Sequence, residues 1–455
     1  MTAVAPVGTN ATRLWGIGAE ERLRRIAAAQ KLELRPDGEL LVNLGFAFDP
    51  GWLKLVAASP GLVVTRDGVP VLAHALDGER DEIALAMERD RPLRGPDEAM
   101  LPGEGRGPAA WSEGLDPGLR RATLPGEGRG PAARSEGLDP GFRRETLPGE
   151  GRGPAARSEG LDPGLRRETL PGEGRGPAAR PEGLDPGLRR ETLTWESAGG
   201  LENEELRKKE RPFMDRLAPE NVRSLERASY FGAYKGVTDL LTKYLWPEWA
   251  LVLTRWAARI GMSPNQVTFV GALLCLLATW LFHEGWYWSG LAAGLAFMVL
   301  DTVDGKLARC TITASKIGEA FDHGIDLVHP PFWWWAWGMG LHAYGRPLDP
   351  ELFWWTLAVI VGAYVVQRLI EGAFIARFGM HIHVWRRFDS RFRLITARRN
   401  PNMVILLAFL LAGRPDWGLL AVAAWTLISL VVHIVQLAQA MAAKAAGRPV
   451  VSWLA

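Results

Sequence analysis

Six apolar runs follow one another from residue 261 to the end of the chain. They lie at 264–283, 287–308, 315–341, 352–377, 400–413 and 417–441. A helix needs about 20 predominantly apolar residues to cross the hydrocarbon of a bilayer, and only the fifth run is clearly shorter. The sequence therefore predicts an all-α polytopic membrane domain over 261–455, with six transmembrane helices.

Basic residues gather in every second connection between these runs, which fixes the expected orientation. Arg255 and Arg259 precede the first run, and six arginines lie between the fourth and fifth runs, whereas the opposite side has only Arg346 and Arg414. Cytoplasmic loops carry the excess of Lys and Arg. We expect both termini and the connection between runs two and three to be cytoplasmic, in the inner (cell) membrane of a bacterium.

Three further parts precede the membrane domain. Residues 1–95 combine helical spacing over 13–30 with short strand patterns over 39–48, 61–65 and 69–76, which predicts a small soluble α/β or α+β domain. Its first thirty residues have no basic start followed by an apolar run, so we expect no cleaved signal peptide.

Residues 96–195 form a low-complexity linker that contains the 23-residue unit LPGEGRGPAARSEGLDPGLRRET four times with few changes. Each unit has too few large apolar side chains to offset the entropy of ordering the chain. We expect disorder there, and a spacer or an interaction arm is the functional alternative.

Residues 196–260 are charged and then amphipathic, which suits a helix that lies along a membrane surface before the first span. The formal net charge of the whole chain is only +2, so nothing points to nucleic acid as a partner. Cys275 and Cys310 are the only cysteines, and they suggest neither a disulfide framework nor a thiolate metal site.

Four aspartates lie where the second apolar run ends and the third begins, in DTVDGKLARCTITASKIGEAFDHGID. Asp301 and Asp304 are three residues apart, and Asp322 and Asp326 are four apart, so each pair shares a helix face. A short turn at 310–314 allows all four carboxylates to converge at the cytoplasmic edge. Unpaired, they would repel one another at membrane depth, whereas divalent cations such as Mg²⁺, Mn²⁺ or Ca²⁺ would neutralise them.

The residues between the aspartates suit a phosphate ligand. Two metal ions held by carboxylates can clamp a pyrophosphate and stabilise charge in an in-line displacement. Gly305 and Gly318 remove side chains where a phosphate or a neighbouring helix must approach. Ala308 keeps the wall of the site small, and Arg309 offers a planar donor fork for phosphate.

This stretch resembles the signature D-x-x-D-G-x-x-A-R-x₈-G-x₃-D-x₃-D of the CDP-alcohol phosphotransferase (CDP-alcohol phosphatidyltransferase) family. The eight fixed positions are Asp301, Asp304, Gly305, Ala308, Arg309, Gly318, Asp322 and Asp326. The resemblance covers about 200–455 and leaves out the repeat.

The resemblance implies a reaction in which an acceptor hydroxyl attacks the β-phosphorus of a CDP-alcohol, forms a phosphodiester and releases CMP, as in phospholipid biosynthesis. It implies two Mg²⁺ (or Mn²⁺) ions, with Asp301, Asp304 and Asp322 as main ligands, and Asp326 as the general base that also contacts a metal. The other motif residues would line the nucleotide and phosphate site, joined by Asn265 and Thr268 of SPNQVT. Members of the family are usually homodimers.

The donor alcohol and the acceptor are left open by the motif. The layout looks closest to members that join CDP-inositol to inositol phosphate behind a fused cytidylyltransferase domain. The front domain here lacks the Gly-rich L-x-A-G-x-G-x-R loop, so a degenerate, inactive nucleotidyltransferase is the expectation. Arg368, Arg398 and Arg399 are candidates for an acceptor phosphate. The general excess of arginine in cytoplasmic loops would explain Arg398 and Arg399 equally well. An ion pair with Glu371 would explain Arg368.

Two other functions remain possible, and two groups of histidines are expected to have structural roles only. An ion-coupled transporter would place its acids near the bilayer middle and would show internal repeats, and a catalytically silent scaffold would have lost a motif aspartate. His329 is expected to pack or to hydrogen-bond rather than to act. The segment 381–393 is expected to be a solvated basic loop, because His381 and His383 have no neighbouring ligands in the sequence.

Overall fold

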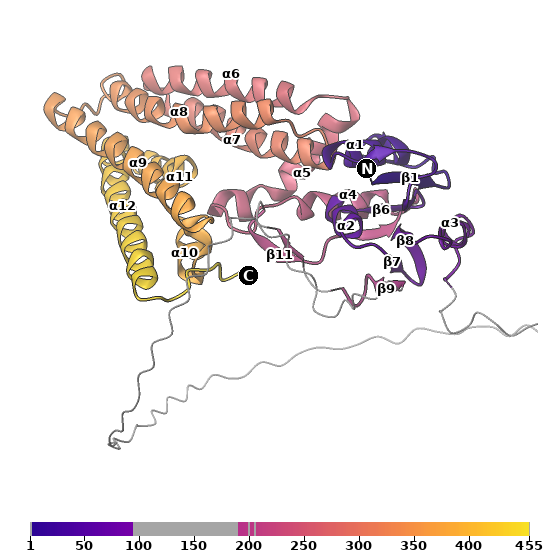
Figure 1. Ribbon diagram of the computed structural model, residues 1–455. Coiled ribbons are helices and arrows are strands. Elements are labelled where there is room, and N and C mark those ends of the chain that lie inside the picture. The colour runs from indigo at the N-terminus through magenta and orange to yellow at the C-terminus, as the bar shows by residue number, and fades with distance from the viewer. Residues whose placement is uncertain (1, 94–189, 199–200, 204–205, 455) are drawn as a thin grey trace, which may run out of the picture. The chain divides into compact units, whose positions relative to one another are not determined.

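The computed structural model describes residues 2–93, 190–198, 201–203 and 206–454 (Figure 1). Residues 1–97 and 186–455 make up one compact unit, and 98–185 fall in a second unit. The predicted disorder of the repeat falls almost wholly outside the described residues and stays a prediction.

A six-stranded sheet forms the centre of the N-terminal part, as the predicted α/β class requires. Its strand order is β4-β1-β5-β8-β7-β9, with β1 parallel to β4 and β5, and β8 antiparallel to β5 and β7. The elements are β1 (Ala3–Val7), α1 (Ala19–Ala29), β4 (Glu33–Leu34), β5 (Leu40–Asn43), β6 (Phe46–Phe48), α2 (Pro50–Ala57), β7 (Leu62–Arg66), β8 (Val69–His74), α3 (Arg80–Glu88) and β9 (Glu191–Thr194).

The helix expected over 13–30 begins later than predicted. Residues 13–18 form a tight hairpin of β2 (Arg13–Leu14) and β3 (Ile17–Gly18), and α1 follows from Ala19. The two turn residues, Trp15 and Gly16, both have positive φ angles (57° and 75°), as a two-residue hairpin turn requires. The Trp15 side chain is buried and donates its Nε1–H to Ser229 Oγ at 2.7 Å. Tertiary burial of Trp15 therefore overrides the helical spacing.

Strands from beyond the repeat complete the N-terminal fold. β9 pairs in parallel with β7, and β12 (Met214–Arg216) pairs antiparallel with β6. The predicted boundary at residue 95 therefore leaves out two strands that belong to the folded part. Between them, β10 (Leu201–Asn203) and β11 (Lys208–Glu210) form a separate antiparallel hairpin.

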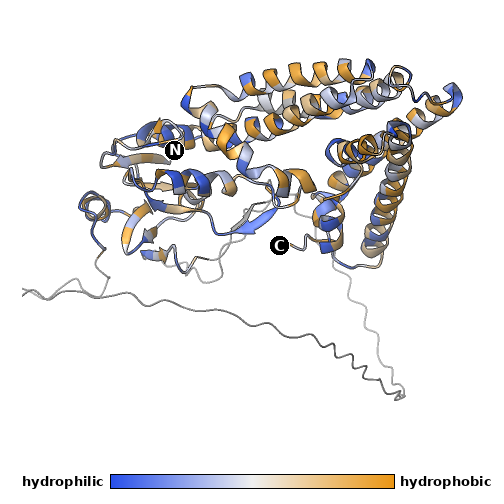
Figure 2. Cartoon of the chain, turned by 180° about the vertical axis from the view of Figure 1, so that it is seen from behind, coloured by the Kyte–Doolittle hydropathy of each residue, from blue (hydrophilic) through white to orange (hydrophobic). Residues whose placement is uncertain are grey.

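Six helices occur at the six predicted apolar runs: α6 (Pro264–His283), α7 (Tyr287–Cys310), α8 (Lys316–Gly340), α9 (Pro350–Phe378), α11 (Arg399–Leu411) and α12 (Pro415–Ala445). Among the described residues, α6, α9 and α12 are long and apolar enough to cross a membrane. α11 is a shorter apolar helix, and α7 and α8 carry charged residues at the ends where they meet. Figure 2 shows the hydrophobic colouring concentrated on these helices.

The segment before the first long helix is not one continuous surface helix. It contains α4 (Val222–Gly232), a π-helical turn η1 (Leu241–Leu245) and α5 (Pro247–Arg259). Pro247 is the first residue of α5, where the missing N–H of proline costs nothing. Trp249, Val252 and Trp256 of α5 are exposed, and their spacing places them on one face of the helix.

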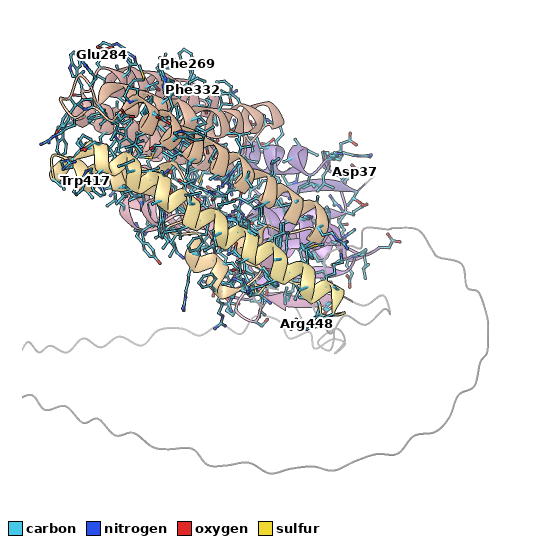
Figure 3. All side chains as sticks on the ribbon, turned by 90° about the vertical axis from the view of Figure 1, so that its left-hand side faces the viewer. Asp37, Phe269, Glu284, Phe332, Trp417 and Arg448 are labelled. Carbon is cyan, nitrogen blue, oxygen red and sulfur yellow. The ribbon has the colours of Figure 1, made fainter. Side chains whose placement is uncertain are left out.

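The helices pack in two groups. The groups meet where α8 contacts α9 and where α7 contacts α11. α6 packs along α7 and α8, and α9 packs along α12, which also contacts α11. Large apolar side chains remain exposed on the outside of these groups; Figure 3 labels Phe269 on α6 and Phe332 on α8. Such surfaces are expected where lipid, rather than water, surrounds a protein.

The C-terminal end of α7 is held by the N-terminal fold. Arg22 of α1 is buried and donates to Phe48 O at 3.0 Å and to Cys310 O at 3.3 Å, and Arg25 donates to Thr311 O at 3.0 Å. Cations at a helix C-terminus also interact favourably with the helix dipole. The turn that leads to α8 is thus fixed by residues that lie outside the six long helices.

Close packing between α6 and α8 leads to a first prediction. A Cβ at Gly340 would lie 1.9 Å from Phe282 O, so Gly340→Ala should destabilise the fold, by about 1–3 kcal/mol as for other overpacked sites. Gly362→Ala is the matched control, because nothing lies within 4 Å of a Cβ there and alanine favours a helix interior.

Thermal unfolding of the detergent-solubilised variants tests this. We expect a lower melting temperature for Gly340→Ala and an unchanged or higher one for Gly362→Ala. Equal melting temperatures for the two variants would contradict the close approach of α8 to the end of α6.

Candidate active site

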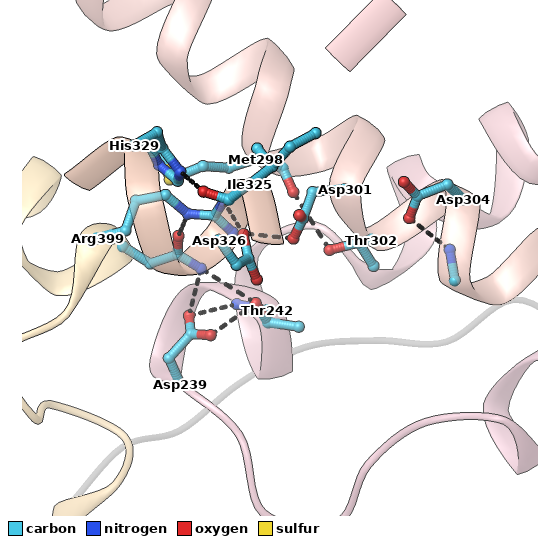
Figure 4. A network of polar contacts seen from close by, with 12 residues as sticks. Asp239, Thr242, Met298, Asp301, Thr302, Asp304, Ile325, Asp326, His329 and Arg399 are labelled. Atoms are coloured by element: carbon cyan, nitrogen blue, oxygen red, sulfur yellow. Dashed lines mark hydrogen bonds and ion pairs between the residues drawn. The ribbon is translucent and has the colours of Figure 1, made fainter. Parts of the chain in front are cut away.

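Two of the motif aspartates converge on one cationic group. Arg399, at the start of α11, donates from Nη2 to Asp301 Oδ2 at 2.9 Å and from Nη1 to Asp326 Oδ1 at 2.6 Å (Figure 4). Asp301 lies on α7 and Asp326 on α8, so three helices meet at this point. The predicted convergence of these two carboxylates is therefore present, with a guanidinium between them.

Asp304 lies one turn along α7 and is buried. Its Oδ2 accepts a 2.6 Å hydrogen bond from Thr268 Oγ1 of α6, and its Oδ1 accepts from Gly305 N. Thr268 was predicted from the SPNQVT segment, and the structure places it beside a motif aspartate. The α6 segment thus contributes directly to this edge of the site.

Other motif residues also lie in contact with one another. A Cβ at Gly318 would come within 2.9 Å of Asn265 Oδ1, so the start of α8 approaches the start of α6 as closely as glycine allows. A Cβ at Gly305 would lie 3.1 Å from Arg309 Nη2. Ala308 is partly buried on the same helix. Asp322 lies in α8, but its side chain is outside those that the structure describes.

A second polar network supports Arg399 and was not predicted. Arg399 Nε donates to Asn400 Oδ1 at 3.0 Å, and Asn400 Nδ2 donates to Asp239 Oδ1 at 3.0 Å. Asp239 also accepts from the backbone N–H and the hydroxyl of Thr242. Burial would raise the pKa of Asp239, but Arg393 and these hydrogen bonds outweigh it and hold the pKa below its ordinary value. Asp239 lies in the segment 196–260, which precedes the first apolar run.

Among the side chains that the structure describes, Arg368 and Arg398 contact Glu371 and not Asp301 or Asp326. Both donate to the same oxygen, Glu371 Oε1 on α9, at 2.9 Å and 2.5 Å. The ion pair expected between Arg368 and Glu371 is present. Of the three arginines predicted for an acceptor phosphate, Arg399 alone touches Asp301 and Asp326.

The prediction of a solvated basic loop over 381–393 is wrong. The segment forms η2 (Ile382–Val384) and α10 (Arg387–Phe392), and His383 and Asp389 are buried. His383 Nε2 lies 3.3 Å from Glu371 Oε1, and His433 Nε2 lies 3.4 Å from the same oxygen. Glu371 lies on α9, 12 residues before His383, and His433 lies on α12, so the spacing within 381–393 gave no signal for these partners.

Two groups of residues present potential metal ligands. The carboxylates of Asp301, Asp304 and Asp326 supply the hard oxygen donors that Mg²⁺ and Mn²⁺ prefer, and two of them already surround a cation. Glu371, His383 and His433 also bring one ligand atom each within 4.8 Å of one another. Oε1 of Glu371, however, already accepts from two arginines.

His329 has a packing role, as expected. Its Nδ1 lies 2.7 Å from Ile325 O, and its ring packs edge-on against Phe297 and Trp333. The histidine is buried three residues after Asp326 in the sequence. None of its described contacts is with an aspartate.

Comparison with known proteins agrees with the motif. Residues 261–435 match the family model of the CDP-alcohol phosphatidyltransferases. Cholinephosphotransferase 1 from chicken is 33% identical over 127 residues, which are 26% of this chain and 36% of that protein. The human protein of the same name is 32% identical over 133 residues, covering 27% and 32%.

A fission-yeast protein described as an uncharacterized CDP-alcohol phosphatidyltransferase class-I family protein is 33% identical over 107 residues, covering 21% of this chain and 28% of its own length. The chain thus spans about a third of the length of these curated relatives. The family match begins at 261, so the part of the predicted resemblance over 200–260 stays a prediction. Within those limits, residues 261–435 are a CDP-alcohol phosphatidyltransferase domain.

Proposed function

We propose that this chain is a membrane-embedded, metal-dependent phosphotransferase that moves a substituted phosphate from a CDP-alcohol to an acceptor hydroxyl. The observation that carries the proposal is the convergence of Asp301 and Asp326 on a single cation, Arg399, at the meeting point of three helices. Transporter and scaffold functions have no comparable observation in their favour among the described residues.

The reacting atoms define the roles of the motif residues. The acceptor oxygen bonds to the β-phosphorus while the bond from that phosphorus to the bridging oxygen breaks, and CMP leaves. Asp326 is more exposed than the other two motif aspartates whose side chains are described, Asp301 and Asp304, and it takes the hydroxyl proton. Arg309, whose buried Nε has no partner among the described residues, is positioned for the donor phosphates, as are Gly305, Ala308 and Gly318.

Asp301, Asp304, Asp322 and Asp326 are the residues that would hold two Mg²⁺ or Mn²⁺ ions. Bound there, the ions would neutralise the pyrophosphate and the charge that develops on it. Arg399 neutralises the same two carboxylates that an ion would use, so metal binding and this ion pair are in competition. Thr268 and Asn265 fix the α6 edge of the nucleotide site.

The proposed enzyme lies in a membrane. We propose that α7, α8 and α11 cross the membrane together with α6, α9 and α12, with both termini and the site on the cytoplasmic side. The exposed face of α5, with Trp249, Val252 and Trp256, would lie at the lipid surface. A homodimer is proposed from the family resemblance. The relatives compared come from animals and yeast, so they add no support for a bacterial membrane.

The donor and acceptor need a direct test, because sequence layout and relatives point differently. The layout favours CDP-inositol, whereas the relatives are named cholinephosphotransferases. Purified full-length protein with Mg²⁺ should release CMP from one of CDP-diacylglycerol, CDP-inositol or CDP-choline when the matching acceptor is supplied.

Asp326→Asn should reduce that CMP release by a factor of about 100 or more, because general base catalysis typically contributes 10²–10⁴ in rate. Glu351→Gln is the control, since it removes an exposed carboxylate at the start of α9. Full activity in Asp326→Asn would exclude Asp326 as the base, and no CMP from any donor by folded protein would contradict the proposed reaction.

Arg399→Gln tests the competition between the guanidinium and the metal. Without metal, the variant should melt at a lower temperature than the wild type, because Asp301 and Asp326 lose the cation between them. Added Mg²⁺ should then raise the melting temperature of the variant more than that of the wild type.

Arg346→Gln serves as the control for Arg399→Gln, because it removes an exposed arginine from the connection between α8 and α9. It should leave both the melting temperature and the response to Mg²⁺ unchanged. An equal Mg²⁺ response in Arg399→Gln and wild type would show that the metal binds elsewhere.

A further inference from the structure

The turn between α7 and α8 contains a β-branched residue in a left-handed conformation. Ile312 has a φ angle of 54° and directly follows Thr311, the C-terminal cap of α7. Thr313 N donates to Ala308 O at 2.8 Å and Ile312 N donates to Arg309 O at 3.3 Å, which is the hydrogen-bond pattern of a Schellman motif. The left-handed position of that motif is usually a glycine, because a β-branched side chain at positive φ is strained.

Other helices of this chain end with the same hydrogen-bond pattern on a glycine. The residues at the corresponding position after α5, α6, α11 and α12 are Gly261, Gly285, Gly413 and Gly447, with φ angles of 72°, 75°, 65° and 69°. A residue with a side chain persists in such a conformation only where the surrounding structure holds it there, and such residues gather at functional sites. Ile312 follows the helix that carries Asp301 and Asp304, so something outside the turn must hold it.

Two arginines of α1 hold the peptide groups that precede Ile312. Arg25 donates from Nη1 to Thr311 O at 3.0 Å, and Arg22 donates from Nη1 to Cys310 O at 3.3 Å. Thr311 O lies in the same peptide plane as Ile312 N, because the peptide unit is planar. The bond from Arg25 therefore fixes the plane whose rotation about the next N–Cα bond sets the φ angle of Ile312.

Arg22 makes this contact part of the N-terminal fold. The side chain is buried and also donates to Phe48 O at 3.0 Å, just before α2. Burial lowers the pKa of Arg22 to about 10, so the guanidinium stays protonated at neutral pH. A cation at the C-terminus of α7 also interacts favourably with the helix dipole. The end of α7 is therefore held by charge as well as by hydrogen bonds.

The direction of this turn decides where the two halves of the aspartate motif meet. Asp301 lies on α7 before the turn and Asp326 lies on α8 after it, and both accept from Arg399. A rotation about one backbone bond redirects the whole chain that follows. Release of Ile312 from positive φ would therefore change the angle between α7 and α8 and move Asp326 relative to Asp301.

We propose that Arg22 and Arg25 are positioning residues for the aspartates: they hold Ile312 at positive φ and so direct α8 toward the metal-binding face of α7. The N-terminal fold then has a task that needs no nucleotidyltransferase activity. What the aspartates bind rests on the proposed function, whereas the control of the turn by α1 does not.

Mn²⁺ binding to full-length protein in nanodiscs measures the arrangement of the aspartates without any turnover, because binding removes the sharp EPR signal of the free ion. Arg25→Gln should raise the Kd for Mn²⁺ about tenfold, since loss of a group that orients metal ligands typically costs 10–100-fold in metal affinity. Asp304→Asn should remove most of the binding. Undiminished binding by Asp304→Asn would place the ion away from the aspartates and overturn the proposal.

Arg24→Gln is the matched control for Arg25→Gln. Both arginines pair with Glu21, but Arg24 is exposed, whereas Arg25 also donates to Thr311 O. Arg24→Gln should change the Kd for Mn²⁺ by less than about twofold, because exposed ion pairs contribute little. Hydrogen exchange of the Thr313 amide, which is bonded to Ala308 O, should become faster in Arg25→Gln and stay unchanged in Arg24→Gln.

A change at Ile312 should rescue the arginine variant. In the Arg25→Gln background, Ile312→Gly should bring the Kd for Mn²⁺ back to within about threefold of the wild-type value, because glycine adopts positive φ without strain. Ile312→Ala removes the same side chain but keeps the strain, so it should give no rescue. The pair of variants thus separates the backbone conformation from the packing of the side chain.

A merely structural role of Arg25 would give a different result. It would lower the melting temperature of Arg25→Gln while the folded protein kept the wild-type affinity for Mn²⁺, and this would overturn the proposal. Equal affinities in Arg25→Gln and Arg24→Gln, or equal rescue by Ile312→Gly and Ile312→Ala, would also overturn it. Arg22→Gln is a second variant with the same expectation if Arg25→Gln does not fold.

The assay of CMP release separates this proposal from the proposed function. Mn²⁺ binding that depends on Arg25, without CMP release from any donor, would contradict the proposed reaction and keep the positioning role. CMP release by wild-type protein that binds no Mn²⁺ would keep the reaction and overturn the positioning role. Neither binding nor release by folded wild-type protein would contradict both.

Discussion

The ion pairs of Arg399 with Asp301 and Asp326 hold together the part of the structure on which the site depends. One guanidinium joins α11 to α7 and α8, and Asn400 extends the contact to Asp239 before the first long helix. Breaking one side of such an arrangement leaves an uncompensated charge in a partly buried place. The three helices are therefore positioned by the same carboxylates to which we assign the proposed chemistry.

α7 is fixed on several sides by residues outside the long helices. Lys306 donates to Ala233 O and lies 3.5 Å over the Tyr234 ring, and Trp246 Nε1 donates to Thr302 Oγ1. Arg22 of α1 reaches the end of the same helix. The part of the chain that precedes the long helices is thus a structural partner of the helix that carries Asp301 and Asp304, whatever its ancestry.

The sequence predicted the helices and the aspartate site better than it predicted their surroundings. Apolar runs and motif spacing are local signals, so the six helices and the approach of Asp301 to Asp326 followed from them. The cluster around Glu371 joins α9, η2 and α12. Contacts over such sequence distances leave no periodic pattern. The Trp15 hairpin was missed for a related reason, since its burial against Ser229 depends on α4.

The pairing of β9 with β7 and of β12 with β6 makes the repeat an insertion into a folded unit rather than a tether between two units. Both ends of the inserted segment are anchored in the same compact body. For an insertion of this kind, closure entropy grows only with the logarithm of length, at about 0.6 kcal/mol per doubling. Gain or loss of a whole 23-residue copy should therefore be nearly neutral for the fold. Copy number is then free to differ between otherwise identical chains.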